Sequence, residues 1–350
     1  MVNGPEDAGE WEAIDWQARE LDVARLRRRI FTAAREGDWP KVRNLQKMML
    51  RSWSNTLVSV RQVTQRNAGR ATAGVDGVVA LDGPARMKAA VRVHQSVMSW
   101  RPLPVRRVYI PKANGKQRPL GIPVIMDRCH QARVKNALEP EWEARFEPRS
   151  YGFRPGRCCQ DAAEALYGVL RGRARRVWIL DADLTAAFDK ISHCFLLDQL
   201  GTFPAREMIA GWLKAGVFEA GKGFAPTEEG TPQGGVLSPV LLNVALHGLE
   251  EAAGVRYRGG EGDHADHARN NSPVLVRYAD DFVVCCFTEQ QASGVRERLE
   301  GWLAGRGLSL NQDKTRVVPL TQGFDFLGAT RSRTVRVSTL EGGMVVVTAA

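Results

Sequence analysis

The 350-residue sequence lacks the features of membrane-spanning, secreted and disulfide-rich proteins. No apolar run reaches the roughly 18 residues that a membrane-spanning helix needs. The six cysteines include two adjacent pairs but no C-x-x-C, so they indicate buried thiols in a reducing compartment, not a zinc site or a disulfide framework. The first twenty residues are acidic, unlike a signal or transit peptide. We therefore expect a cytoplasmic protein that does not bind membranes.

Over most of the chain, acidic residues are also fewer than basic residues. The net charge is +10, and the first twenty residues contribute −5, so residues 21–350 carry +15. A field of this sign favours a polyanion such as nucleic acid, although basic proteins that bind none are about as common. The 44% of apolar residues is ordinary for a globular chain and excludes a mainly disordered one. The length allows one to three domains at roughly 150 residues each.

Hydrophobic periodicity predicts several helices. Residues 11–65 have helical spacing, and Asp38 before Trp39-Pro40 is typical of a helix start. A Gly-rich loop is expected at 66–78. Further helices are expected at 127–147, 160–171, 192–216, 236–252 and 289–306.

Short apolar runs predict two hairpins and an isolated strand. The first hairpin pairs 105–110 with 118–122 around Asn114-Gly115, a strong turn signal. The second pairs 274–278 with 282–287, and the single strand is 177–182. Helices and hairpins in this order predict an α+β fold with a largely antiparallel sheet.

Two carboxylate motifs could support chemistry. Tyr278-Ala279-Asp280-Asp281 lies at the tip of the second hairpin, and Asp181-Ala182-Asp183 ends the single strand. Clustered carboxylates repel one another unless a cation is present. Mg²⁺ prefers hard oxygen ligands, and two such ions about 4 Å apart can clamp an in-line phosphoryl transfer. A hairpin tip that faces a strand end could bring these carboxylates to one point.

The motifs have simpler alternatives. An aromatic-x-Asp-Asp match is expected by chance about 0.07 times in a chain of this composition. Asp280-Asp281 could be an acidic surface turn, and Asp183 could cap a helix.

A series of sequence blocks, taken together, resembles one known family. The blocks are Tyr109–Pro123, Tyr151–Gly156, Asp181–Asp189, Gly230–Pro239, Val276–Val284, Leu308–Thr315 and Gly323–Gly328. In this order they are similar to the motifs of reverse transcriptases of the bacterial group II intron maturase type. Residues 11–77 also resemble the N-terminal segment of that family. The resemblance covers nearly the whole chain.

The resemblance implies a right-hand polymerase with fingers and an antiparallel palm sheet. The expected parts are a helical RNA-binding extension at 1–78, fingers at 79–175, a palm at 176–335 and a tail at 336–350. The family usually continues into a helical thumb. Only 22 residues follow Gly328, and they are strand-like, so we expect the thumb to be absent and the chain to be truncated after the palm.

The resemblance also implies the catalytic residues. Asp183, Asp280 and Asp281 are the expected catalytic acids and hold two Mg²⁺ ions, for which Mn²⁺ can substitute. Leu184 adjoins this metal site. Asp181 and Asp189 lie nearby, where they are more simply neighbouring or solvent-exposed acids.

Further residues are expected to contact the nucleotide and the primer. Lys112 and Arg118 hold the triphosphate, as the chemistry of their side chains allows. Phe188 faces the sugar, Gln233 bonds the nucleotide and Lys314 protonates the leaving pyrophosphate. The expected primer grip comprises Phe324, Phe326, Leu327 and Gly328. The alternatives are surface positions for the lysines and the arginine, and core packing for the phenylalanines.

The sequence thus predicts an RNA-directed DNA polymerase that adds dNTPs to a DNA or RNA primer on an RNA template. The basic residues of 20–77 and 101–135 are expected to bind RNA, including intron RNA, through its phosphates. One alternative is a splicing cofactor, an RNA-binding maturase whose polymerase centre is idle. Another is a truncated remnant without activity. The polar segment around His264 and His267 is expected to be a loop, not a metal pair.

Overall fold

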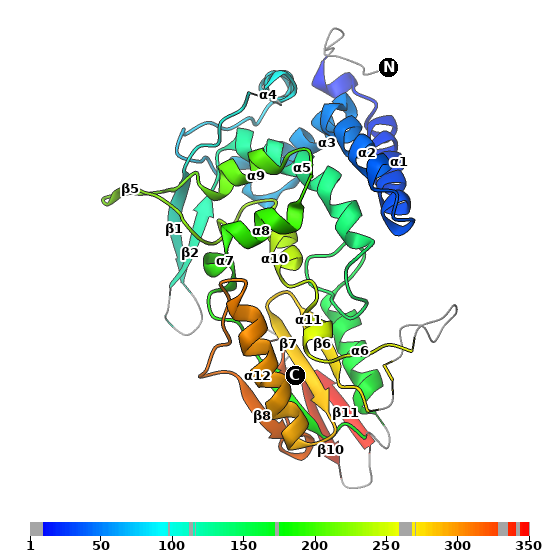
Figure 1. Ribbon diagram of the computed structural model, residues 1–350. Helices are drawn as coiled ribbons and strands as arrows, with labels where there is room; N and C mark the ends of the chain where they lie inside the picture. Colours follow the sequence, from blue (N-terminus) through cyan, green and yellow to red (C-terminus); the bar gives the residue numbers. More distant parts are fainter. Residues whose placement is uncertain are drawn as a thin grey trace. The chain divides into compact units, whose positions relative to one another are not determined.

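The chain folds into two compact units, each built from segments far apart in sequence (Figure 1). The structure is a computed structural model that describes residues 10–96, 99–111, 115, 117–171, 175–258, 268–269, 271–327, 335–340 and 344–349. Unit 1 comprises residues 1–145 and 193–241, and unit 2 comprises residues 146–192 and 242–350. The domain boundaries expected at residues 78, 175 and 335 stay predictions.

The N-terminal part of unit 1 is helical, as predicted. It contains α1 (Trp16–Arg35), α2 (Trp39–Arg51), α3 (Trp53–Arg61) and α4 (Gly83–Gln95), with short 3-10 or π turns at Trp11–Ala13, Gln62–Arg66 and Ala68–Ala71. Side-chain caps begin these helices. The Asp38 carboxylate accepts a hydrogen bond from the Lys41 backbone N–H at 3.1 Å, and Pro40 lies in the first turn, which confirms the predicted start. Asp15 and Ser52 cap α1 and α3 in the same way.

Helix α5 (Ile125–Glu143) contacts α1, α2, α3 and α4 and is buried along most of its length. Several of its buried polar groups have hydrogen-bond partners inside the unit, although Nε of Arg133 has none among the described residues. The Asp127 carboxylate, for example, accepts hydrogen bonds from the indoles of Trp100 and Trp212 at 2.6 and 2.7 Å. Burial without such partners would be costly.

The sheet of unit 1 contains the first predicted hairpin. Its order is β2-β1-β4-β5, formed by β1 (Val105–Pro111), β2 (Gln117–Ile122), β4 (Val217–Glu219) and β5 (Gly223–Ala225). β1 and β2 pair antiparallel as predicted, whereas β1 and β4 pair parallel. The helix predicted at 192–216 is instead two helices, α8 (His193–Leu200) and α9 (Arg206–Leu213). Gly201, with a φ of 50°, and Pro204 lie in the break and cannot easily continue a helix.

Unit 2 is built on the predicted antiparallel sheet. Its order is β6-β7-β3-β8, formed by β6 (Val274–Tyr278), β7 (Asp281–Cys286), β3 (Trp178–Ala182) and β8 (Arg316–Pro319). The second predicted hairpin is therefore confirmed, with Ala279 and Asp280 as its two-residue turn. Its strands are apolar on both faces because helices cover them: α6 (Cys159–Leu170) contacts β6, and α12 (Glu289–Ala304) contacts β3, β7 and β8 (Figure 1).

Shorter elements complete unit 2. The helix predicted at 236–252 is broken at Gly248, whose φ of 94° does not fit a helix, into α10 (Ser238–Ala245) and α11 (Leu249–Ala252). Helix α7 (Ala187–Lys190) follows β3, and a 3-10 turn at Leu320–Gln322 follows β8. The strand-like end of the chain is confirmed: β9 (Asp325–Phe326), β10 (Val335–Leu340) and β11 (Met344–Ala349) form a sheet. Within the described ranges, no helix is long and apolar enough to cross a membrane.

Candidate active site

Strand pairing in unit 2 brings the two acidic motifs together. Ala182 is paired with Phe282 between β3 and β7, and Tyr278 is paired with Asp281 across the hairpin. Asp183 follows the last residue of β3, and Asp281 is the first residue of β7. Because neighbouring antiparallel strands run in opposite directions, the end of β3 lies beside the start of β7. The carboxylates of Asp183 and Asp281 therefore occur on one surface.

These carboxylates line a cleft of about 370 Å³ in unit 2, which we call the acidic cleft. Its lining residues are Asp181, Ala182, Asp183, Asp281, Phe282, Asp313, Lys314, Arg316, Asp325, Phe326 and Leu327. The acidic side chains in this lining outnumber the two basic ones, Lys314 and Arg316. The cleft is therefore suited to a cationic occupant.

The loop after β3 is fixed by the segment that precedes β8. The Asn311 backbone N–H donates to the Asp183 carbonyl at 2.8 Å, and the Thr185 N–H donates to the Ser309 carbonyl at 3.0 Å. Leu184 lies between them, is only 4% exposed and bridges to Leu310. Main-chain bonds on both sides of the buried Leu184 side chain hold the backbone at Asp183 in place.

Burial and neighbouring carboxylates both disfavour the charged form of Asp281 in the acidic cleft. Burial, together with the neighbouring carboxylates of Asp280 and Asp183, raises the pKa of Asp281 to about 7. The Lys314 ammonium donates to the Asp183 carboxylate, and this hydrogen bond raises the pKa of Lys314. Asp183 and Asp281 line the same cleft, and Asp280 is the chain neighbour of Asp281. Nearby positive charge lowers their repulsion.

Three residues that the sequence did not single out also line the acidic cleft. Arg316 is paired with Asp181 between β8 and β3, and its guanidinium donates to that carboxylate at 3.2 Å. Burial raises the pKa of Asp181, and Arg316 opposes the rise. Asp313 and Asp325 are exposed acids at the cleft. Their only sequence signal was their place inside the last two motif blocks.

The donor chemistry fits a hard divalent cation, since carboxylate oxygens are the ligands that Mg²⁺ prefers. In the part of the chain that the structure describes, no group of three His, Cys, Asp or Glu side chains is arranged as a ready metal site. The Lys314 ammonium is bonded to Asp183. The carboxylates that line the cleft are the oxygen donors available to such a cation.

The remaining predicted residues of unit 2 lie beside the acidic cleft or in the core. Phe188 is half-buried on α7, and its ring meets that of Phe153 edge-on, with centroids 6.2 Å apart. Phe324 and Phe326 are 4% and 2% exposed and belong to the hydrophobic core, although Phe326 also lines the cleft. Leu327 lines the cleft with a φ of 63°. Gly328 and the segment around His264 and His267 lie outside the described residues.

The predicted nucleotide-binding residues of unit 1 lie on or near its sheet. Arg118 is exposed on β2, whereas Lys112 lies outside the described residues. The Gln233 carbonyl accepts a hydrogen bond from the Gly121 backbone N–H of β2 at 2.7 Å. Gly234 has a φ of 117°, and a Cβ there would approach the Gly121 carbonyl oxygen to 2.9 Å, so this contact requires glycine.

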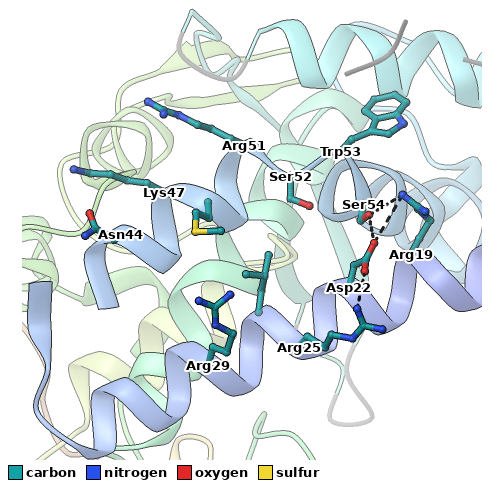
Figure 2. A pocket seen from close by; sticks show the side chains of 12 residues that line it. Arg19, Asp22, Arg25, Arg29, Asn44, Lys47, Arg51, Ser52, Trp53 and Ser54 are labelled. Carbon is teal, nitrogen blue, oxygen red and sulfur yellow. Dashed lines mark hydrogen bonds and ion pairs between the residues drawn. The ribbon is translucent and has the colours of Figure 1, made fainter. Parts of the chain in front are cut away.

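A second cavity, of about 630 Å³, lies among α1, α2 and α3 in unit 1, and we call it the basic groove (Figure 2). Its lining residues are Arg19, Asp22, Arg25, Leu26, Arg29, Asn44, Lys47, Met48, Arg51, Ser52, Trp53 and Ser54. The lining has a net charge of +4 because it holds five cations and one acid. Its apolar members are Leu26, Met48 and Trp53.

The single acid of the basic groove, Asp22, already has partners within the groove. The Ser54 hydroxyl donates to Asp22 at 3.0 Å, and the Arg19 and Arg25 guanidiniums lie 3.8 and 3.5 Å from its carboxylate (Figure 2). Arg29, Lys47 and Arg51 are exposed and form no ion pair with any residue that the structure describes. The basic groove therefore presents positive charge to an outside ligand.

Comparison with known proteins agrees with the resemblance inferred from the motifs. Residues 110–331 match the family described as reverse transcriptase (RNA-dependent DNA polymerase), and residues 11–93 match the N-terminal domain of reverse transcriptase. The chain belongs to the reverse transcriptase family. The predicted class, RNA-directed DNA polymerase, is thereby confirmed.

The relatives of the chain include group II intron proteins. Protein YkfC of Escherichia coli (strain K12) is 35% identical over 335 residues, which cover 87% of each chain. Group II intron-encoded protein LtrA of Lactococcus lactis subsp. cremoris is 30% identical over 322 residues. The match covers 75% of this chain and 52% of LtrA, so the chain spans about half the length of that relative. A telomerase structure from Candida albicans has a TM-score of 0.45 at 16% identity over 68% of this chain and 44% of that one, too low to add to the argument.

Proposed function

We propose that the acidic cleft is the polymerase centre and that it extends a primer 3′-hydroxyl with dNTPs on an RNA template. The observation that supports this is the meeting of Asp183 and Asp281, which are nearly a hundred positions apart in sequence, on one cleft beside Asp280. Asp183, Asp280 and Asp281 would hold two Mg²⁺ ions, with Mn²⁺ as a substitute and Leu184 adjoining them. When bound, the ions supply activation of the attacking hydroxyl and stabilisation of the leaving pyrophosphate.

The other predicted site residues of both units have complementary roles in this proposal. Lys314, which donates to Asp183, would give a proton to the leaving pyrophosphate. Arg118 and Lys112 bind the triphosphate, Gln233 bonds the nucleotide and Phe188 excludes a 2′-hydroxyl. Leu327 and Gly328 support the primer end by their backbone, and the buried Phe324 and Phe326 hold that segment in place. Residues 79–175 correspond to the fingers, 176–335 to the palm and 336–350 to a tail.

Primer extension tests the polymerase centre. On a poly(rA) template with an oligo(dT) primer, the wild-type chain should incorporate dTTP with Mg²⁺ or Mn²⁺. Asp280→Asn should reduce incorporation by at least about 100-fold while RNA binding stays unchanged, because only the reacting groups lose a carboxylate. Asp198→Asn, an exposed acid on α8, is the charge-matched control and should behave as wild type. Full activity of Asp280→Asn would contradict the proposal, and a wild-type chain that binds RNA but incorporates nothing would support the splicing-cofactor alternative.

We further propose that the helical extension at 1–78 binds RNA, including intron RNA, in the basic groove. Arg25 and Arg29 on α1, and Lys47 and Arg51 on α2, are each spaced four residues apart, about 6 Å along a helix. Such rows can follow a phosphate backbone, while the apolar residues can contact an unstacked base. The match of residues 11–93 to a reverse transcriptase N-terminal domain supports this assignment.

Neighbouring arginines of α1 provide a matched test of the basic groove. Arg29 lines the groove, whereas Arg28 is also exposed but is not among the lining residues. Arg29→Gln should weaken RNA binding and reduce its salt dependence by about one phosphate contact. Arg28→Gln should change affinity much less. Equal losses in both would indicate only a general effect of net charge.

A further inference from the structure

Arg277 is a buried arginine inside an otherwise apolar strand, three residues before Asp280. It is 1% exposed, and its guanidinium makes three directed contacts. Nη1 donates to the Asn243 side-chain oxygen and to the Ala279 carbonyl, both at 2.9 Å, and Nη2 donates to the Ser150 hydroxyl. Arg277 therefore joins three separate segments, one of which is the turn that bears Asp280.

The segment 149–152 encloses that turn from the side. It runs parallel along β6: the Arg277 N–H donates to the Arg149 carbonyl at 3.0 Å, and the Tyr151 N–H donates to the Arg277 carbonyl at 2.9 Å. Gly152 then passes so close to the turn that a Cβ would lie 2.1 Å from the Ala279 backbone nitrogen. The amide of Asn243 donates to the Gly152 carbonyl at 2.9 Å and fixes this approach.

The turn itself is in an unusual conformation. Ala279 is 5% exposed and has a φ of 58°, at a hairpin position where glycine or asparagine is usual. A residue with a Cβ keeps such a backbone only where its surroundings determine it. The contacts of Arg277, Asn243 and Gly152 are those surroundings.

We propose that Ser150, Gly152, Asn243 and Arg277 form a turn clamp that positions the carboxylates of Asp280 and Asp281 for catalysis. The inference rests on the proposed polymerase function for its catalytic meaning. None of the four lines the acidic cleft, so they are positioning residues. They act on the backbone of the turn, and through it on the direction in which the two carboxylates point.

The chemistry of the clamp requires arginine. A guanidinium offers several donors in a rigid planar fork, whereas an ammonium is a compact point charge. Its burial is balanced by acids: Glu147 and Glu250 of the same unit favour the charged form, although burial lowers the pKa of Arg277 to about 10. A lysine here would keep the charge and lose the simultaneous contacts with Asn243, Ser150 and the Ala279 carbonyl.

Arg277→Lys in the full chain tests the clamp by two measurements. In metal-free protein, hydrogen exchange of the amides at 278–282 should be about tenfold faster or more, because the turn loses its side contacts. In primer extension, kcat should fall by about tenfold or more, while the KM for dNTP stays within about threefold, because misplaced carboxylates affect the reacting geometry.

A matched buried arginine controls for loss of stability. Arg133 of unit 1 is 2% exposed and donates to the backbone carbonyls of Val93 and Leu50. Arg133→Lys should lower the unfolding temperature similarly and leave exchange at 278–282 and kcat within about twofold of wild type. Turn exchange in Arg277→Lys no faster than in Arg133→Lys would overturn the clamp.

A double-mutant cycle provides an independent test of the clamp. Asn243→Ala should speed amide exchange at 278–282 and lower kcat as Arg277→Lys does. The double variant should have a kcat only slightly below that of the less active single variant, because both residues act on one turn. Losses of kcat that add in the double variant would overturn the proposal. If Arg277→Lys does not fold, the rate of amide exchange at 278–282 in Asn243→Ala tests the clamp instead. If the wild-type chain incorporates no dNTP, the polymerase function fails while the exchange measurements still test the clamp.

Discussion

Phe188 shows how one side chain could decide the choice of sugar. It lies on α7, five residues after Asp183, and its ring is supported edge-on by Phe153. Ala186, just before α7, has a φ of 46°, which turns the chain sharply after the acidic strand end. A bulky ring at this point would clash with a 2′-hydroxyl, whereas a ring used only for packing would not discriminate between sugars.

Phe188→Ala should therefore increase incorporation of ribonucleotides relative to deoxynucleotides by about tenfold or more, because removing the clash removes a discrimination of the order of 1–3 kcal/mol. The ratio of kcat/KM for UTP and dTTP measures this effect. Phe224→Ala is a suitable control, because Phe224 is 60% exposed on β5 and belongs to the other unit. An unchanged ratio in Phe188→Ala would leave Phe188 as a packing residue.

At the scale of elements, the hairpin that bears Asp280 and Asp281 depends on a close approach of backbone to backbone. Gly152→Ala would place a Cβ against the Ala279 nitrogen, which cannot move aside as a flexible side chain could. We expect a destabilisation of roughly 1–3 kcal/mol and a loss of incorporation in the folded protein. Chemical denaturation and primer extension measure the two effects.

Gly168 provides the opposite case in the same unit. It is exposed within α6, and nothing lies within 4 Å of a Cβ built there. Gly168→Ala should stabilise the protein by roughly 0.5–1 kcal/mol, because alanine favours the helix. If Gly152→Ala and Gly168→Ala changed the free energy of unfolding equally, backbone crowding at Gly152 would not be the cause of the effect of Gly152→Ala.

At the scale of the whole molecule, buried charge makes stability depend on pH. Burial raises the pKa of Glu250 from 4.5 to about 7, and Tyr257 and the backbone of Arg149 donate to its carboxylate. The folded protein thus binds this proton more tightly than the unfolded chain. The free energy of unfolding therefore falls as the pH rises from about 4.5 to about 7, and the lost stability is not regained above that range.

Glu250→Gln should remove the part of that fall that Glu250 contributes, while Asp281, whose pKa is also raised to about 7, keeps its own part. The variant should match wild type near pH 4 and exceed it above pH 7, by at most on the order of 3 kcal/mol. Denaturant unfolding at several pH values measures the difference. Glu251→Gln, at the exposed neighbouring position, should keep the wild-type slope. A slope as steep in Glu250→Gln as in wild type would assign the pH dependence to Asp281 or another group.

Local sequence determined much of this protein. The Asp38 cap, the hairpin at 274–286 and the strand that ends before Asp183 follow from short-range patterns, because capping, alternation and apolar runs act between near neighbours. The same patterns missed the breaks near Gly201 and Gly248, where apolar helical spacing continues on both sides of a backbone that turns.

Tertiary structure alone decided the surroundings of the acids. Phe326 packs in the core, Arg316 joins Asp181 across two strands, and Arg277 reaches Ser150, 127 positions earlier in the chain. No local pattern contains these partners, because they are neighbours only after the sheet has formed and its strands have taken their register. The sequence identified the acids of the cleft, whereas the packing of distant segments determined how they are held.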